Sequence, residues 1–212
     1  MANTARYTNK LSKTNCAAVL VDYLDGFLPG LRSIDRDLYE RNVKGFTGTV
    51  LALSLPHCVL GDEGGFRGQF FPIIKRDFSD APTFARHTPS AMRSGDFPEW
   101  IRERRSEGRS KFVLGGISID NCTMQTSLDL LAEGLEVYVV VDACGAESEL
   151  VERAAILRLI QAGAVPINWT QLACEVMDNW QSEEGPAIGR LLSEHSRYGA
   201  LGVPGGAPEA TS

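Results

Sequence analysis

The chain alternates short, continuously apolar runs with longer segments of helical periodicity, and this pattern is what most constrains its fold. Cys16–Asp22, Lys111–Ile117 and Glu136–Asp142 are runs of the apolar kind, which is typical of strands buried on both faces. Strands that are separated by helices pair in parallel, through right-handed crossovers. We therefore predict a single doubly wound α/β domain, with a mostly parallel six-stranded sheet and helices on both faces in a Rossmann-like three-layer arrangement.

The remaining elements follow the same alternation. We expect three further strands, at His57–Leu60, Pro82–Arg86 and Ala164–Ile167. We expect helices at Asp37–Leu55, Arg67–Phe78 with an interruption at Pro72, Phe97–Glu107, Asp120–Glu133, Ser148–Ala162 and Leu172–Trp180. Ligands bind at the carboxyl ends of the strands in such a sheet. Polar residues directly after a strand are therefore the first candidates for a functional site.

Composition excludes several classes of function. The chain has 212 residues and a net charge of −6, which disfavours a nucleic-acid partner. No apolar run approaches the ~20 residues that span a membrane, and the start lacks the apolar centre of a secretory signal. The 5 cysteines are odd in number and show no C-x-x-C spacing, so we expect free thiols in a reducing, cytoplasmic compartment.

We divide the chain into an N-terminal arm at 1–14, a folded domain at 15–197 and a flexible tail at 198–212. The tail is rich in glycine and proline and contains little that can pack.

Three chemically capable residues follow strand ends: Asp22, Arg86 and Cys122. We expect them to meet at one edge of the sheet. A thiol at a helix N-terminus lies in the positive end of the helix dipole, which favours its thiolate. Asp22 is placed to take the thiol proton and to return it to a leaving amine. Arg86 stays protonated, so its role is to orient Asp22 and stabilise negative charge.

Each of these residues also has an ordinary structural interpretation. A cysteine near a helix start is often a core residue, an aspartate after a strand often caps a turn, and an arginine there often forms a surface salt bridge. Two neighbours stay open as well. Asp25 is either a second acid or a turn cap, and Cys144 is a partner for oxidation of Cys122 only if the two lie close together.

Several separated motifs give the chain a resemblance to a known family. The segments Leu114–Cys122 and Val137–Ala143 resemble the glycine-to-cysteine loop and the V-x-V-V-x-D-A strand of the isochorismatase-like cysteine hydrolases. Within that superfamily the sequence is similar to the YcaC-like group, through Ala18–Phe27, Asp80–Arg86 and Gln161–Trp180. The resemblance spans roughly residues 15–195, which makes the folded domain an isochorismatase-like hydrolase domain.

The resemblance implies an activity and roles for the site residues. Cys122 matches the nucleophile of a C–N hydrolase that forms a thioester acyl-enzyme, and Asp22 matches the acid/base. Most of the superfamily has a lysine at the position of Arg86, whereas the YcaC-like group has an arginine there, as this chain does. The usual role of that lysine in amide hydrolysis therefore does not transfer directly to Arg86. The family also implies a cis peptide at Ile117–Ser118, and an oxyanion hole made by the backbone amides of Ser118 and Cys122.

The resemblance further implies a small amide-like substrate and a homo-oligomer, which is a dimer, tetramer or octamer in the family. The Trp169–Trp180 stretch and exposed loop aromatics suit such packing. We expect Phe27, Phe66, Ile117 and His87 to contact the substrate, with Phe70 and Phe71 as further candidate walls. The histidines lack the metal-ligand spacing of nicotinamidase relatives, so we expect neither a metal nor a cofactor.

Two other functions remain open at this point. A chain with arginine in place of lysine is also compatible with a non-catalytic or ligand-binding oligomeric scaffold of the same fold. A vinyl-ether hydrolase of the isochorismatase type is the other alternative, and that reaction needs no cysteine nucleophile.

Overall fold

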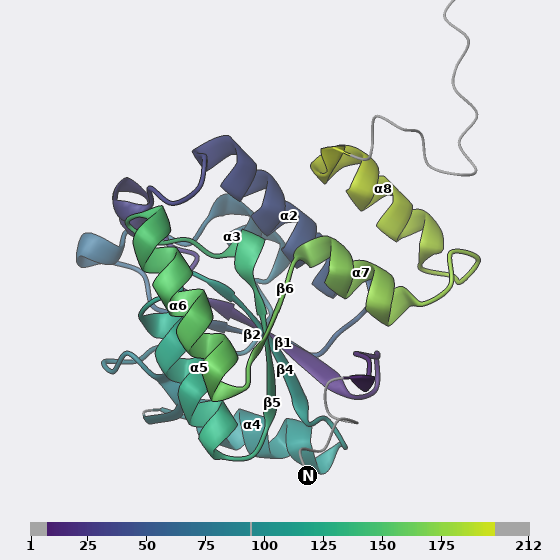
Figure 1. The fold of residues 1–212 in the computed structure, drawn as a ribbon, viewed down its shortest axis with the longest axis horizontal. Helices are drawn as coiled ribbons and strands as arrows, with labels where there is room; N and C mark the ends of the chain where they lie inside the picture. The colour runs from purple at the N-terminus through teal and green to yellow at the C-terminus, as the bar shows by residue number, and fades with distance from the viewer. Residues whose placement is uncertain (1–7, 94, 198–212) are drawn as a thin grey trace, which may run out of the picture.

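A parallel sheet forms the centre of the molecule (Figure 1). The computed structural model describes residues 8–93 and 95–197. The 6 strands lie in the order β3-β2-β1-β4-β5-β6, and all the registered neighbours pair in parallel. The strands are β1 (Cys16–Val21), β2 (His57–Leu60), β3 (Thr83–Phe84), β4 (Lys111–Gly116), β5 (Glu136–Val140) and β6 (Val165–Ile167). The predicted doubly wound α/β fold is confirmed.

Helices cover both faces of the sheet (Figure 1). One face carries α2 (Arg36–Ala52), α3 (Pro72–Asp77), α7 (Trp169–Met177) and α8 (Gly185–His195), and the other carries α4 (Phe97–Ser106), α5 (Cys122–Ala132) and α6 (Glu149–Ala162). Strand β1 shows how the two layers arise. Leu20 packs in the cluster that contains Phe46 of α2, whereas its neighbour Val19 packs in the cluster that contains Trp100 of α4, because successive strand residues point to opposite faces.

Three predicted elements differ most clearly from the observed ones. The helix expected over 67–78 begins only at Pro72, which occupies the first turn and lacks the amide that a helix interior needs. The third strand ends at Phe84, so Arg86 lies on the following loop. Helix α7 starts at Trp169, earlier than predicted, because Asn168 and Gln171 form a capping box there.

The order of the strands places a crevice between β1 and β4. Strand β1 is followed by β2 on one side, whereas β4 is followed by β5 on the other side. The crossovers therefore diverge at this point, and the carboxyl ends of the two strands border an open crevice. Asp22 directly follows β1, and Cys122 begins the helix after β4.

The described part of the predicted N-terminal arm is bound to the domain. Leu11 donates its backbone N–H to Glu175 Oε1 at 2.6 Å, and the buried Lys111 donates to the Asn9 carbonyl at 2.8 Å. The tail predicted at 198–212 lies outside the described residues. Among the described helices, none has the length and apolar character needed to cross a bilayer.

Candidate active site

A buried ion pair joins the loop after β3 to the end of β1. Arg86 Nη1 donates to Asp22 Oδ1 at 2.9 Å, and Nη2 donates to Oδ2. Each of the two side chains is only 5% exposed. Burial by itself would lower the pKa of Arg86, but the hydrogen bonds and the charge of Asp22 raise it above the ordinary value. The guanidinium therefore stays protonated and fixes the carboxylate at two points.

The backbone around Asp22 is adapted to hold this carboxylate. Asp22 has a φ of +50°, which is uncommon for a residue with a side chain and is typical of functional sites. Gly61 has a φ of +126°, and a Cβ on it would lie 2.9 Å from Asp22 Oδ1. A glycine at 61 therefore leaves the space that the carboxylate occupies.

Cys122 begins helix α5 and lines the same pocket as Asp22 and Arg86. Burial, followed by the negative charge of Asp22, raises the pKa of Cys122 to about 12, and Arg86 offsets only part of this. This result differs from the expectation that the helix dipole favours the thiolate. Desolvation and a neighbouring carboxylate outweigh the dipole here, so the resting side chain of Cys122 is a protonated thiol near the Asp22 carboxylate.

The loop between β4 and α5 contains the predicted cis peptide at Ile117–Ser118. Ile119 donates its N–H to the Gly145 carbonyl at 3.0 Å, and Thr123 donates to the Ser118 carbonyl at 3.2 Å. The N–H groups of Ser118 and Cys122 donate to no acceptor in the part of the chain that the structure describes. These two amides are therefore available to a bound molecule.

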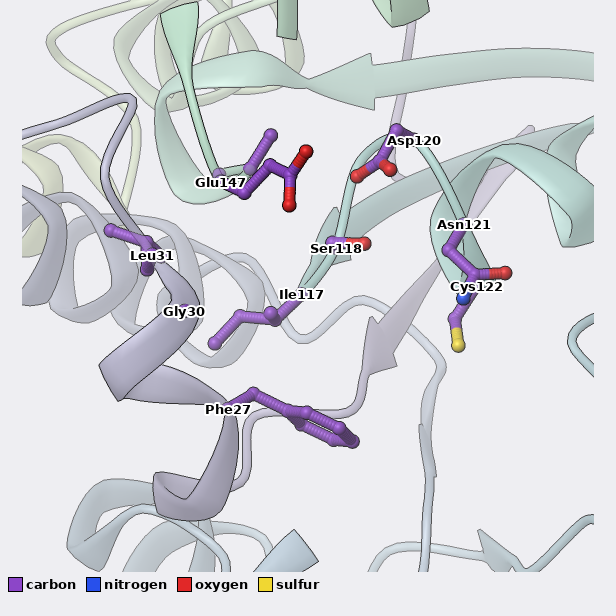
Figure 2. A pocket seen from close by; sticks show the side chains of 11 residues that line it. Phe27, Gly30, Leu31, Ile117, Ser118, Asp120, Asn121, Cys122 and Glu147 are labelled. Carbon is purple, nitrogen blue, oxygen red and sulfur yellow. The ribbon is translucent and has the colours of Figure 1, made fainter. Parts of the chain in front are cut away.

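A cavity with two lobes surrounds the thiol. The Ser118 lobe has a volume of about 240 Å³ and is lined by Leu31, Ile117, Ser118, Asp120, Ala146 and Glu147 (Figure 2). The Arg86 lobe has a volume of about 330 Å³ and is lined by Asp22, Asp62, Phe66, Arg67, Arg86 and His87. Phe27, Asn121 and Cys122 line both lobes, so Cys122 lies at the boundary between them.

The structure places the residues predicted to contact substrate at different depths. Phe27, in the 3₁₀ turn η1 (Asp25–Gly30), and Ile117 line the Ser118 lobe (Figure 2). Phe66 is 76% exposed and stands edge-on to Phe27 with 6.1 Å between the ring centroids. His87 is also exposed, at the rim of the Arg86 lobe. Phe71 is a core residue and lines neither lobe.

Several cavity residues escaped the sequence analysis. Asp120, Asn121 and Glu147 line the Ser118 lobe, and Asp62 and Arg67 line the Arg86 lobe. Asp120 and Asn121 lie in the loop between the end of β4 and Cys122. Polar residues that follow a strand were the expected candidates for a functional site, so this loop was a place to find them. The position of Glu147 depends on the bridge between Ile117 and Gly145, for which the sequence gives no signal.

The two neighbours left open by the sequence have structural roles. Asp25 Oδ1 accepts the Gln69 N–H at 2.8 Å, so this carboxylate caps the adjacent loop. Cys144 is fully buried and its sulfur accepts the Gly116 N–H at 3.4 Å. Cys122 and Cys144 are both free thiols, and burial raises the pKa of Cys144 to about 12.

No metal site is visible among the residues at 8–93 and 95–197, where no group of at least 3 His, Cys, Asp or Glu side chains could hold an ion. His57 is in β2, His87 is in the loop after β3 and His195 ends α8.

Comparisons with known proteins agree with the observed fold. A family model for the isochorismatase domain matches residues 56–171. Probable hydrolase YcaC of Escherichia coli K12 is 31% identical over 188 residues, which is 88% of either chain. The structure of YcaC from Pseudomonas aeruginosa with hexane-2,5-diol and covalent acrylamide has a TM-score of 0.84 and 29% identity, covering 91% of this chain and 95% of that one. The Escherichia coli YcaC structure, an octameric hydrolase of unknown specificity, has a TM-score of 0.82 and 30% identity, covering 88% of this chain and 90% of that one.

Proposed function

Because this chain belongs to the isochorismatase family of hydrolases, we propose that it hydrolyses the C–N bond of a small amide-like molecule through a thioester on Cys122. The position of one carboxylate beside two partners carries this proposal. Asp22 is held at two points by Arg86 and lines the same lobe as Cys122, whose pKa the charge of Asp22 helps to raise. A base, a nucleophile and a group that orients the base thus lie together in one lobe, which is the arrangement that nucleophilic catalysis requires.

The raised pKa of Cys122 decides how the thiol is activated. Because that pKa is about 12, the thiolate forms only as Asp22 takes the proton during attack on the carbonyl carbon. The C–N bond then breaks, and the departing nitrogen takes the proton back from Asp22. Asp22 next removes a proton from water, which attacks the thioester. The carboxylic acid leaves and the thiol regains its proton.

The oxyanion of each tetrahedral intermediate needs donors that are already in place. The unpaired N–H groups of Ser118 and Cys122 support this role, because preorganised amides stabilise charge that develops in the transition state. Arg86 donates to Asp22 throughout and limits the negative charge that the buried site must hold.

The size of the cavity supports a small substrate. Lobes of about 240 and 330 Å³ lie at or near the lower end of the range for small-molecule sites. The YcaC structure from Pseudomonas aeruginosa contains covalent acrylamide, which is itself a small primary amide.

The proposal is tested by screening small primary amides for ammonia release with the wild type and the Cys122→Ala variant. We expect release by the wild type to fall at least about a thousandfold in the variant. Unchanged turnover of a confirmed substrate by Cys122→Ala would instead favour vinyl-ether-type chemistry without a cysteine. Ligands that raise the melting temperature of the wild type without forming product would favour the scaffold function.

We also propose that the chain forms a homo-oligomer in a reducing, cytoplasmic setting. All 5 cysteines are free, which supports the reducing setting. The YcaC of Escherichia coli is described as octameric, which supports the homo-oligomer. The outward face of α6 supports an interface between copies, because Leu150, Leu157 and Ile160 are 77%, 54% and 46% exposed. Of the two tryptophans expected at an interface, Trp180 is 52% exposed but Trp169 is only 1% exposed and belongs to the core.

A further inference from the structure

The charges that line the cavity are distributed unevenly between its two lobes. In the Arg86 lobe each arginine already has an acidic partner. Arg86 is paired with Asp22, and Arg67 Nη2 lies 2.5 Å from Asp62 Oδ2. Both cations are therefore compensated before any substrate enters, and an incoming anion would have to compete with a carboxylate that is already in place.

The Ser118 lobe carries two carboxylates without a countercharge. Asp120 and Glu147 line this lobe, and Figure 2 shows their carboxylate groups turned toward one another near Ser118. Neither side chain has an ion pair or a hydrogen bond within the described residues (8–93 and 95–197). The rest of the lobe is apolar or uncharged, with Phe27, Leu31 and Ile117 among its lining residues.

His87 is the remaining basic side chain that lines the cavity. It is exposed at the rim of the Arg86 lobe and does not line the Ser118 lobe. Among the described residues, the cavity therefore has two uncompensated carboxylates and no unpaired arginine or lysine. The net charge of −6 on the whole chain acts in the same direction.

We propose that this site selects uncharged or cationic amide-like molecules and rejects anionic ones, and that Glu147 and Asp120 determine this selectivity. The inference rests on the proposed hydrolysis at Cys122 and narrows its substrate class. Carboxylate-bearing amides and dicarboxylate vinyl ethers are excluded by charge, because they would meet Asp120 and Glu147 beside the reacting carbonyl.

The test compares alkylation of Cys122 by iodoacetamide and by iodoacetate at pH 8, with peptide-resolved mass spectrometry. Both reagents need the same thiolate, so the ratio of their rates is independent of the pKa of Cys122. The exposed Cys174 is the internal reference. We expect the neutral-to-anionic rate ratio at Cys122 to exceed that at Cys174 by about tenfold.

Two variants with the same change of charge localise the effect. Glu147→Lys reverses a charge that lines the Ser118 lobe. Glu149→Lys reverses a charge two residues later, at a position that is exposed like Glu147 but lines neither lobe. We expect Glu147→Lys to remove most of the tenfold preference at Cys122 and Glu149→Lys to leave most of it. Equal ratios at Cys122 and Cys174 in the wild type, or equal effects of the two variants, would overturn the inference.

A matched pair of amides extends the test to turnover. Pentanamide and succinamate differ little in size, but succinamate carries a carboxylate. Faster hydrolysis of pentanamide, with a preference that Glu147→Lys reduces, supports both proposals. Hydrolysis of both amides without preference contradicts only the charge selectivity. A charge-selective alkylation pattern with no hydrolysis of any amide contradicts only the proposed reaction.

Discussion

Arg86 and Asp22 form a two-point ion pair in which each side chain is only 5% exposed. The pair joins the loop after β3 to the end of β1 and fixes the carboxylate in the lobe that Cys122 also lines. Its burial has an energetic consequence. Two charges removed from water stabilise a fold only weakly as a pair, but removal of one partner leaves the other charge uncompensated.

Arg86→Ala should therefore destabilise the protein by about 3 kcal/mol in urea unfolding. Arg93→Ala is the matched control, because Arg93 pairs with Asp129 while its own side chain is 69% exposed, and it should cost less than about 1 kcal/mol. Similar losses in the two variants would mean that the Asp22–Arg86 pair is not buried in solution.

Asp22→Asn should separate thiol reactivity from catalysis. The charge of Asp22 raises the pKa of Cys122, so its removal should increase alkylation of Cys122 at pH 8 by about tenfold. Amide hydrolysis should be lost in the same variant, because asparagine cannot accept the thiol proton. Alkylation at Cys174 provides the reference. Slower alkylation of Cys122 in Asp22→Asn would show that Asp22 does not oppose the thiolate.

Asp142 gives a prediction for the pH dependence of stability. Burial raises the pKa of this carboxyl to about 6, above the ordinary value of ~3.9. The native state thus holds a proton that the unfolded state releases, and stability falls as the pH rises through this window. Asp142→Asn should stabilise the protein at pH 7 by about 2 kcal/mol, since an amide oxygen still accepts the Trp169 N–H.

The gain from Asp142→Asn should vanish near pH 3.5, where the wild-type carboxyl is protonated in both states. Urea unfolding at the two pH values measures this. A gain of equal size at both values would indicate a packing effect instead of a proton.

Gly61→Ala should impair the site more than the fold. The new Cβ would approach Asp22 Oδ1 to 2.9 Å at a φ of +126°. Gly108→Ala is the matched control, with a φ of +86° and no atom within 4 Å of the added Cβ. Both variants should lose about 1 kcal/mol or more of stability from backbone strain, but only Gly61→Ala should lose at least about tenfold in kcat/KM. A loss of kcat/KM in both variants would refute this role for Gly61.

Leu157→Glu should weaken the proposed assembly. Leu157 is 54% exposed on the outward face of α6, where a new charge costs the monomer little but opposes burial in an interface. Light scattering after gel filtration should show a smaller particle than for the wild type. Leu51→Glu, at a 37% exposed leucine of α2, is the control. An unchanged mass for Leu157→Glu would place the interface elsewhere.

The sequence predicted the sheet and its helices because continuous apolar runs and helical periodicity report burial directly. It also predicted that Asp22, Arg86 and Cys122 meet, since each follows a strand and the carboxyl ends of parallel strands share an edge. The ion pair of Arg86 with Asp22 confirms that proximity for two of them, and Cys122 lines the same lobe as both.

Other properties depended on three-dimensional packing. The raised pKa of Cys122 reflects its burial and the nearby charge of Asp22. The sequence shows that Cys122 stands at a helix start, which favours the thiolate, but it does not show how deeply the thiol is buried or which charges surround it. Glu147 reaches the cavity through a bridge between residues 117 and 145. The helix predicted over 67–78 was too long because Gly68 adopts a positive φ and the chain is irregular between this residue and Pro72.

The most direct test of a Cys122 nucleophile is rapid-quench mass spectrometry during turnover of an amide that the wild type hydrolyses. We predict that the peptide containing Cys122 gains the mass of the acyl group within one turnover and loses it as the acid is released. Wild-type turnover without any acyl adduct on that peptide, together with continued hydrolysis by Cys122→Ala, would contradict the thioester mechanism.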